Sequence, residues 1–232
     1  MPDFFDQLWE QLHNPRSQIQ RHRYLEQLKT LIPLSPSPRL LAHDARSVLQ
    51  TGHILHACPT ELPRVDGPAP DLFLFDLSDG LADPSWFRQA KNAVPMLPFW
   101  RLDVIVDELK VIETRAMGAD AYCLDMGGLD VASAQYLAEV GRDYDIPAVL
   151  VCSREEDLAR AFQIKDVQHY WLRDILVAPQ LLELAWLSGK HVIFDVHSQD
   201  QTAAFAGDWP AKICLVHRET GTVIERLPRE DI

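Results

Sequence analysis

Short apolar runs alternate with segments of helical periodicity along most of the chain. This pattern predicts that strands and helices alternate. The runs are short and nearly uninterrupted, which is typical of strands buried on both faces of a parallel sheet. Helical spacing fills the intervals between them, and this alternation predicts an α/β fold. One predicted strand begins at Pro98. The other predicted strands cover 40–42, 71–76, 121–124, 148–152, 168–174, 191–197 and 211–217.

The segment Pro98–Asp125 contains one complete strand-helix-strand unit. Apolar positions at helical spacing, from Val104 to Ala116, predict an amphipathic helix. Gly118 lies just past its end, where a residue with positive φ costs least. The next strand follows almost at once, so we expect a right-handed crossover between neighbouring parallel strands.

The pattern of apolar positions is less regular in the first seventy residues. Their periodicity predicts two helices, 3–13 and 16–32, which Asn14-Pro15 interrupts because proline lacks the N–H that a helix interior needs. A stiff turn at 33–38 separates these helices from the first predicted strand, 40–42. A helical piece at 48–56 and a proline-rich connection as far as Pro70 complete this part of the chain.

Composition narrows the classes of function. With 232 residues, 47% of them hydrophobic, the chain can bury one large core without a second domain. The formal net charge of -12 argues against nucleic acid and anionic membranes as partners. The sequence has four cysteines without a CxxC pair, no signal peptide and no apolar run of about 18 residues, and it therefore predicts a soluble, cytoplasmic protein.

The segment Pro98–Asp125 also resembles a known family. Four groups of residues match, in register, the third strand, third helix and fourth strand of indole-3-glycerol-phosphate synthases: Arg101-Leu102-Asp103, Asp107, Glu113-Thr114-Arg115-Ala116 and Gly118-Ala119-Asp120-Ala121. The resemblance implies an α/β fold of the (β/α)8 TIM-barrel type in a single domain over 1–232. It further implies an N-terminal helical extension at 1–38, a barrel at 39–232 and an abbreviated C-terminal end.

Positions that carry chemistry in that family hold other residues here. The resemblance places the family's general-acid lysine at Leu102, a glutamate at Val151 and an asparagine at Trp171. Leucine cannot transfer a proton, and a general acid typically contributes about 10²–10⁴-fold in rate. The positions that bind the substrate phosphate in that family differ as well. Val196-His197 replaces Ser-Gly, and His217-Arg218 lacks the family's glycine pair.

A different set of polar residues remains at the predicted strand ends. The candidate catalytic residues are His43, Asp125, Asp195 and His197. Asp195 and His197 are two apart on one strand, so their side chains face the same way, which suits an acid/base pair or a metal pair. Ordinary hydrogen bonds at strand ends are the alternative, and no metal or cofactor is assigned. The candidate ligand-binding residues are Arg101, Trp171, Arg173, His217 and Arg218.

These observations support three functions in order of preference. The first is a pseudoenzyme that binds a small molecule at the barrel mouth, or a protein partner whose identity the sequence does not specify. The second is a repurposed barrel enzyme that uses the Asp and His groups on a small metabolite. The third is a residual indole-3-glycerol-phosphate synthase, a carboxy-lyase of tryptophan biosynthesis. The fold alone does not decide among them, because this architecture hosts many chemistries.

Overall fold

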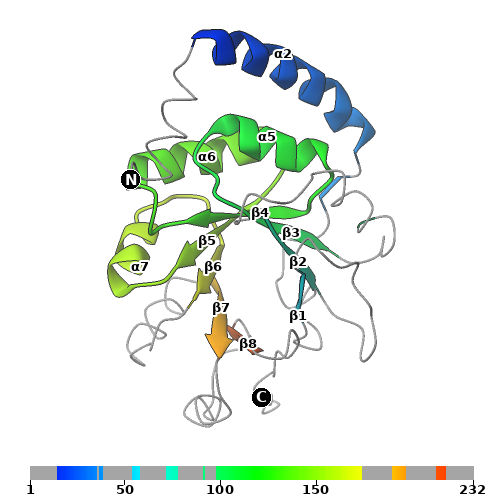
Figure 1. Ribbon diagram of the computed structural model, residues 1–232. Coiled ribbons are helices and arrows are strands. Elements are labelled where there is room, and N and C mark those ends of the chain that lie inside the picture. The colour runs from blue at the N-terminus through cyan, green and yellow to red at the C-terminus, as the bar shows by residue number, and fades with distance from the viewer. Residues whose placement is uncertain are drawn as a thin grey trace, which may run out of the picture.

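One curled sheet of eight strands forms the centre of the protein (Figure 1). The computed structural model describes residues 15–35, 37–38, 54–57, 72–77, 91, 98–173, 190–196 and 213–217. The strands pair in sequence order, and each described pair is parallel. They are β1 (Ile54–Ala57), β2 (Leu72–Asp76), β3 (Phe99–Leu102), β4 (Ala121–Asp125), β5 (Ala148–Cys152), β6 (His169–Leu172), β7 (His191–Val196) and β8 (Ile213–His217).

Helices connect consecutive strands and cover the outer face of the sheet. The helix α5 (Glu108–Ala116) joins β3 to β4, α6 (Val131–Asp143) joins β4 to β5, and α7 (Glu155–Ala161) joins β5 to β6. Eight parallel strands in sequence order with helices outside form the arrangement of a TIM barrel. The predicted fold class is therefore confirmed.

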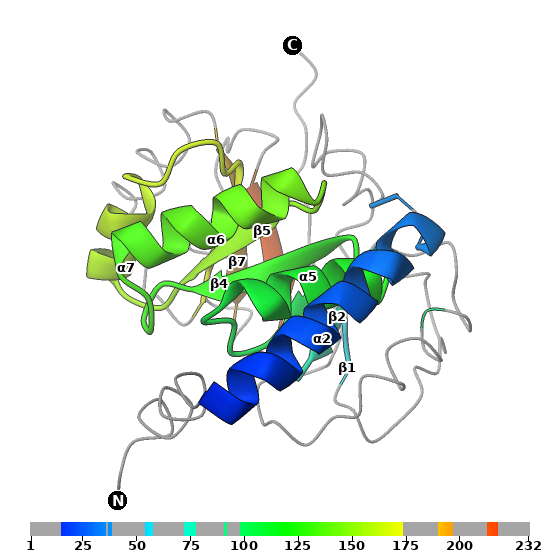
Figure 2. The same cartoon turned by 90° about the horizontal axis from the view of Figure 1, so that it is seen from above.

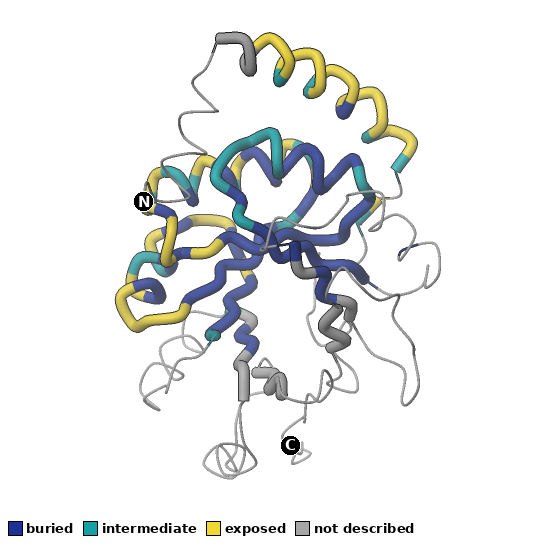
Figure 3. Tube along the Cα trace, viewed as in Figure 1, coloured by how far each residue is buried: buried dark blue, intermediate teal, exposed yellow. Residues whose placement is uncertain are grey.

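The predicted N-terminal helix is confirmed as α2 (Pro15–Leu31), which continues into the short 3-10 helix η1 (Ile32–Leu34). Proline is well suited to the first position of α2, where its missing N–H would have no partner inside the helix. α2 crosses the outside of α5 (Figures 1 and 2). Most of α2 is exposed (Figure 3), but Leu28 is buried in the main core. The predicted helix at 3–13 and the C-terminal end after 217 lie outside the described residues.

The helix after β3 begins later than its apolar pattern predicts. Val104 and Ile105 precede the helix, which starts at Glu108 because Asp107 caps it. The Asp107 carboxylate accepts a hydrogen bond of 3.2 Å from the backbone N–H of Lys110. At the other end, Gly118 has a φ of 82°, as its position predicts.

β1 lies where the sequence predicts the end of a helix. Ile54–Ala57 is a strand, so the helix predicted at 48–56 is wrong for its last three residues, whereas the strand predicted at 40–42 lies outside the described residues. The short run Ile54-Leu55 was hard to recognise because a four-residue apolar segment fits either element and polar residues surround it. His43 lies outside the described residues as well, so its placement at a strand end stays a prediction.

Side chains alternate across the strands and divide the core in two. One cluster lies inside the barrel and the other lies between the sheet and its helices. On β3, Trp100 and Leu102 face the interior, whereas Phe99 belongs to the outer core. We call the inner set the interior cluster; it consists of Leu74, Trp100, Leu102, Ala121, Cys123, Val149, Val151, Trp171 and Ile193.

A glycine allows α6 to pack closely on β4. The hydroxyl of Tyr122 on β4 donates a hydrogen bond of 2.7 Å to the carbonyl of Leu137 on α6. A Cβ at Gly141 would overlap that hydroxyl and lie 2.7 Å from the carbonyl oxygen of Ile146. The close approach of helix and strand therefore requires glycine at this position.

We expect Gly141→Ala to lower the free energy of unfolding by about 2 kcal/mol, because the added methyl group forces the helix and strand apart. Urea unfolding followed by circular dichroism measures this change. The penalty should be smaller in a Tyr122→Phe background, which removes one of the overlapping atoms. A Gly141→Ala variant as stable as the unmodified protein would contradict this account.

Candidate functional site

The carboxyl ends of the eight strands meet at one edge of the barrel, which we call the mouth. Active sites of TIM barrels lie at this edge, since the loops after the strands converge there. The last residues of β3, β4 and β5 are Leu102, Asp125 and Cys152. The candidate site is therefore built from these strand ends and from the residues that follow them.

Apolar side chains fill the inside of the barrel at the positions where the resemblance implies catalytic groups. Leu102 is 4% exposed, Val151 1% and Trp171 4%. All three belong to the interior cluster. Val151 and Trp171 are also register partners across β5 and β6. The three replacements therefore make up one packed, apolar unit.

Trp171 fills the barrel interior with its ring. The sequence left two roles open for this residue, stacking on a flat ligand or plugging the cavity. Its low exposure and its place in the interior cluster favour the plug. The next candidate along the chain, Arg173, directly follows β6 and is half-buried, and its backbone N–H donates a hydrogen bond of 2.8 Å to Cys152.

Asp125 is the candidate catalytic residue whose side chain the structure describes. It is exposed at the end of β4 and is the register partner of Val151. Its carboxylate accepts a hydrogen bond of 2.8 Å from the backbone N–H of Gly127, so it also shapes the turn after the strand. The carboxylate thus lies beside the apolar unit and is accessible from solvent.

The other candidates are placed by backbone alone or not at all. Asp195 lies in β7 opposite Val216, and His217 ends β8 opposite Val196. The side chains of Asp195 and His217 lie outside what the structure describes. His197 and Arg218 lie outside the described residues altogether. The candidate catalytic roles of Asp195, His197 and His43 stay predictions.

Arg101 is placed between β3 and α5. The side chain is 1% exposed, and its Nη2 lies 2.5 Å from an Asp103 carboxylate oxygen and 2.8 Å from Glu113. Its Nη1 donates a hydrogen bond of 3.1 Å to the Thr114 hydroxyl. The guanidinium is thus engaged by residues outside the barrel interior. A direct ligand contact by Arg101 stays a prediction.

The N-terminal helix completes this charged group. The Tyr24 hydroxyl of α2 donates a hydrogen bond of 2.7 Å to Glu113. Burial alone would raise the pKa of Glu113, but the Arg101 charge and the Tyr24 hydrogen bond hold it below 4.5. Burial and the same hydrogen bond raise the pKa of Tyr24 to about 12. We call Arg101, Asp103, Glu113 and Tyr24 the buried ion cluster.

A second charged group near the mouth was missed from the sequence. Asp157 is fully buried in the first turn of α7 and forms ion pairs of 2.9 Å with Arg154 and 2.7 Å with Arg160. Arg160 also donates hydrogen bonds to the carbonyls of Met126 and Leu129 in the loop after β4. The i, i+3 spacing of these charges along the helix was the available signal. The group fixes the loop that follows Asp125.

The described residues offer neither a metal site nor an activated thiol. No group of three or more His, Cys, Asp and Glu within the described part of the chain could hold a metal ion. Burial, followed by the charges of Asp157 and Asp125, raises the pKa of the Cys152 thiol. Cys152 is therefore protonated at neutral pH and is a poor nucleophile. None of the described helices has the length and hydropathy to cross a membrane.

Known proteins give a consistent but partial comparison. A stretch of 86 residues is 38% identical to the indole-3-glycerol phosphate synthase of Leptothrix cholodnii and covers 37% of this chain and 32% of that one. Another stretch, of 80 residues, is 35% identical to the indole-3-glycerol phosphate synthase of Albidiferax ferrireducens. It covers 34% of this chain and 30% of that one. The chain resembles indole-3-glycerol phosphate synthases. The resemblance spans about a third of the length of these relatives, and no family model matches the chain.

A solved structure has a related outline. The crystal structure of KGPDC from Streptococcus mutans superposes with a TM-score of 0.49 at 8% identity. The match covers 64% of this chain and 76% of that one. The fold assignment here depends on strand order and not on this likeness.

We expect Glu113→Gln to lower the free energy of unfolding by about 3 kcal/mol at neutral pH, because it leaves the buried Arg101 with half of its compensating charge. Urea unfolding at pH 7 measures the change. Glu26→Gln is a matched control, since it removes an exposed carboxylate that pairs with Lys29 at 3.0 Å, and it should leave stability unchanged. Equal effects of the two variants would contradict the importance of the buried ion cluster.

The stabilisation from Glu113 should also depend on pH. Because folding lowers its pKa from 4.5, its contribution is complete above pH 4.5 and is lost as the pH falls through the lower, folded-state value. The stability difference between the unmodified protein and Glu113→Gln should therefore be constant from pH 7 to 5 and shrink below 4.5. Chemical unfolding across this range tests the sign, and a difference that grows in acid would refute it.

Proposed function

We propose that this protein is a divergent indole-3-glycerol-phosphate-synthase-like barrel without synthase activity. It acts by binding a small molecule, or a protein partner, at the barrel mouth. The observation that supports this proposal is the packing of Leu102, Val151 and Trp171 into one apolar unit. The resemblance implies a lysine, a glutamate and an asparagine at these positions.

The chemistry of the synthase reaction explains why these replacements matter. Ring closure on an anilino-deoxyribulose phosphate, with loss of carbon dioxide and water, needs groups that donate and accept protons. Leu102 and Val151 have no polar atom in their side chains, and the ring of Trp171 is 4% exposed. A general acid contributes about 10²–10⁴-fold in rate, and losing several such groups lowers it further.

The rim of the mouth remains suited to binding. Asp125 offers an exposed carboxylate after β4, and Arg173 follows β6. A ligand would therefore meet polar groups around an apolar floor, which is the usual composition of a small-molecule site. The net charge of -12 makes nucleic acid and anionic lipid poor partners. The buried Cys152, which forms no disulfide with the described residues, supports a cytoplasmic location.

A repurposed enzyme is the second proposal. The exposed carboxylate of Asp125 favours it, because a base must be accessible to its substrate. Asp195, His197 and His43 would supply the remaining acid, base or ligand groups. This activity would require a substrate other than the synthase substrate.

The synthase assay tests the main proposal. We expect the purified protein to form no indole-glycerol phosphate from the anilino-deoxyribulose phosphate, with product followed by indole fluorescence. The enzyme of Leptothrix cholodnii is the positive control, and the same enzyme with its lysine changed to leucine at the position of Leu102 is the matched negative control. Turnover above that negative control would overturn the proposal.

A further inference from the structure

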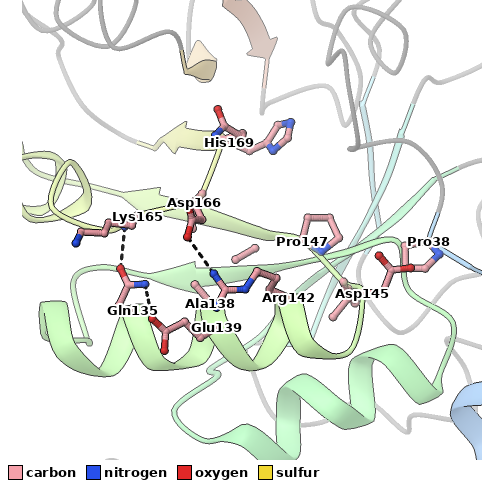
Figure 4. Close-up of a pocket in the computed structure, with 14 residues that line it drawn as sticks. Pro38, Gln135, Ala138, Glu139, Arg142, Asp145, Pro147, Lys165, Asp166 and His169 are labelled. Atoms are coloured by element: carbon pink, nitrogen blue, oxygen red, sulfur yellow. Dashed lines mark hydrogen bonds and ion pairs between the residues drawn. The ribbon is translucent and has the colours of Figure 1, made fainter.

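A pocket of about 270 Å³ lies at the opposite end of the barrel from the mouth (Figure 4). Its walls come from the second half of α6, the turn into β5 and the loop before β6. Pro38, the last residue of the predicted N-terminal extension, closes one side. The volume is just below the range of about 300–1,000 Å³ for small-molecule sites. None of these residues belongs to the site proposed at the mouth.

The floor of this pocket is apolar and its rim is charged. Ala138, Pro147 and Val167 contribute apolar surface. Arg142 and Asp166 form an ion pair of 2.9 Å on the rim and so neutralise each other. The Glu139 carboxylate accepts a hydrogen bond of 2.9 Å from Gln135. Gln135 is neutral, so Glu139 keeps its negative charge.

Three charged groups of the rim form no ion pair within the described part of the chain: Lys165, Asp145 and Glu139. Lys165 lies at one end and Asp145 at the other (Figure 4). Within the described part of the chain, neither the Lys165 ammonium nor the Asp145 carboxylate forms an ion pair. The rim as a whole has two cations and three carboxylates, which disfavours a ligand that is purely anionic.

The backbone around the pocket is unusual as well. Asp145 has a φ of 55° and Asp166 a φ of 64°. They are the only residues other than glycine with positive φ in the described ranges. Aspartate tolerates this conformation better than most residues, and such conformations cluster at sites that hold ligands. Both residues line the same pocket.

We propose that this pocket binds a small zwitterion with an apolar body. Lys165 binds its carboxylate, Asp145 binds its ammonium group, and the floor of Ala138, Pro147 and Val167 packs against the chain between them. The site is separate from the mouth, so its ligand would be an effector or a second cargo. The failure of one site therefore leaves the other proposal intact.

Titration of the ¹⁵N-labelled full chain with 6-aminohexanoate, followed by NMR, tests this site. We expect saturable shifts at 138, 145–148 and 165–168, with a dissociation constant in the millimolar range for so small a ligand. Hexanoate and hexylammonium each lack one of the two charges, so both should bind more weakly. No saturable shift at these residues, or equal binding of all three compounds, would overturn the proposal.

Four variants separate the site from general effects of charge. Asp145→Asn keeps a residue that tolerates positive φ, and Lys165→Met removes the cation; each should weaken binding about threefold to fivefold. Asp143→Asn is the matched control, because it removes an exposed carboxylate that lies outside the pocket, and it should leave binding unchanged. Ala138→Phe should fill the pocket and abolish binding. Equal effects of Asp145→Asn and Asp143→Asn would refute the assignment even if Ala138→Phe failed to fold.

Discussion

The buried ion cluster between β3, α5 and α2 is the constraint on which the described barrel depends. A guanidinium that is 1% exposed, like that of Arg101, would be very costly without nearby carboxylates. Asp103 supplies one from the end of its own strand, and Glu113 supplies the other from α5. The hydroxyl of Tyr24, on α2, then donates a hydrogen bond to Glu113. The strand, the helix and the N-terminal extension are therefore stabilised as one unit.

The two faces of β3 explain why this strand resembles a known family and yet carries a different residue at position 102. Arg101 faces outward into the ion cluster, so its replacement would leave two buried carboxylates with only the partly exposed Lys110 as a nearby cation. Leu102, one residue later, faces the interior cluster and makes no such contact. Alternation along one strand thus separates the retained scaffold from the position that changed. The identity of 35–38% over about a third of the chain fits this division.

The sequence predicted most of the fold because the apolar runs of the central strands are clear and Gly118 marks the end of the helix after β3. It failed at β1, where a four-residue run had no distinctive neighbours. The site was harder to predict. The buried ion pairs of Arg101 were not predicted, because sequence does not reveal which face of a strand a charged residue occupies until the register is known. The Arg160 contacts to the loop after β4 and the pocket near Asp145 depend on tertiary packing, which leaves little local signal.

Under the proposed loss of synthase activity, the interior cluster also limits how that chemistry could return. Val151 is the register partner of both Trp171 and Asp125, and Leu102 packs in the same cluster. A lysine placed alone at position 102 would bury an ammonium group among apolar side chains, and its pKa would fall or the packing would open. A glutamate at 151 would compensate that charge only if Trp171 also gave way to a smaller polar residue. Under the same proposal, regaining catalysis requires concerted change, because a single polar substitution in this cluster costs stability before the other groups are in place.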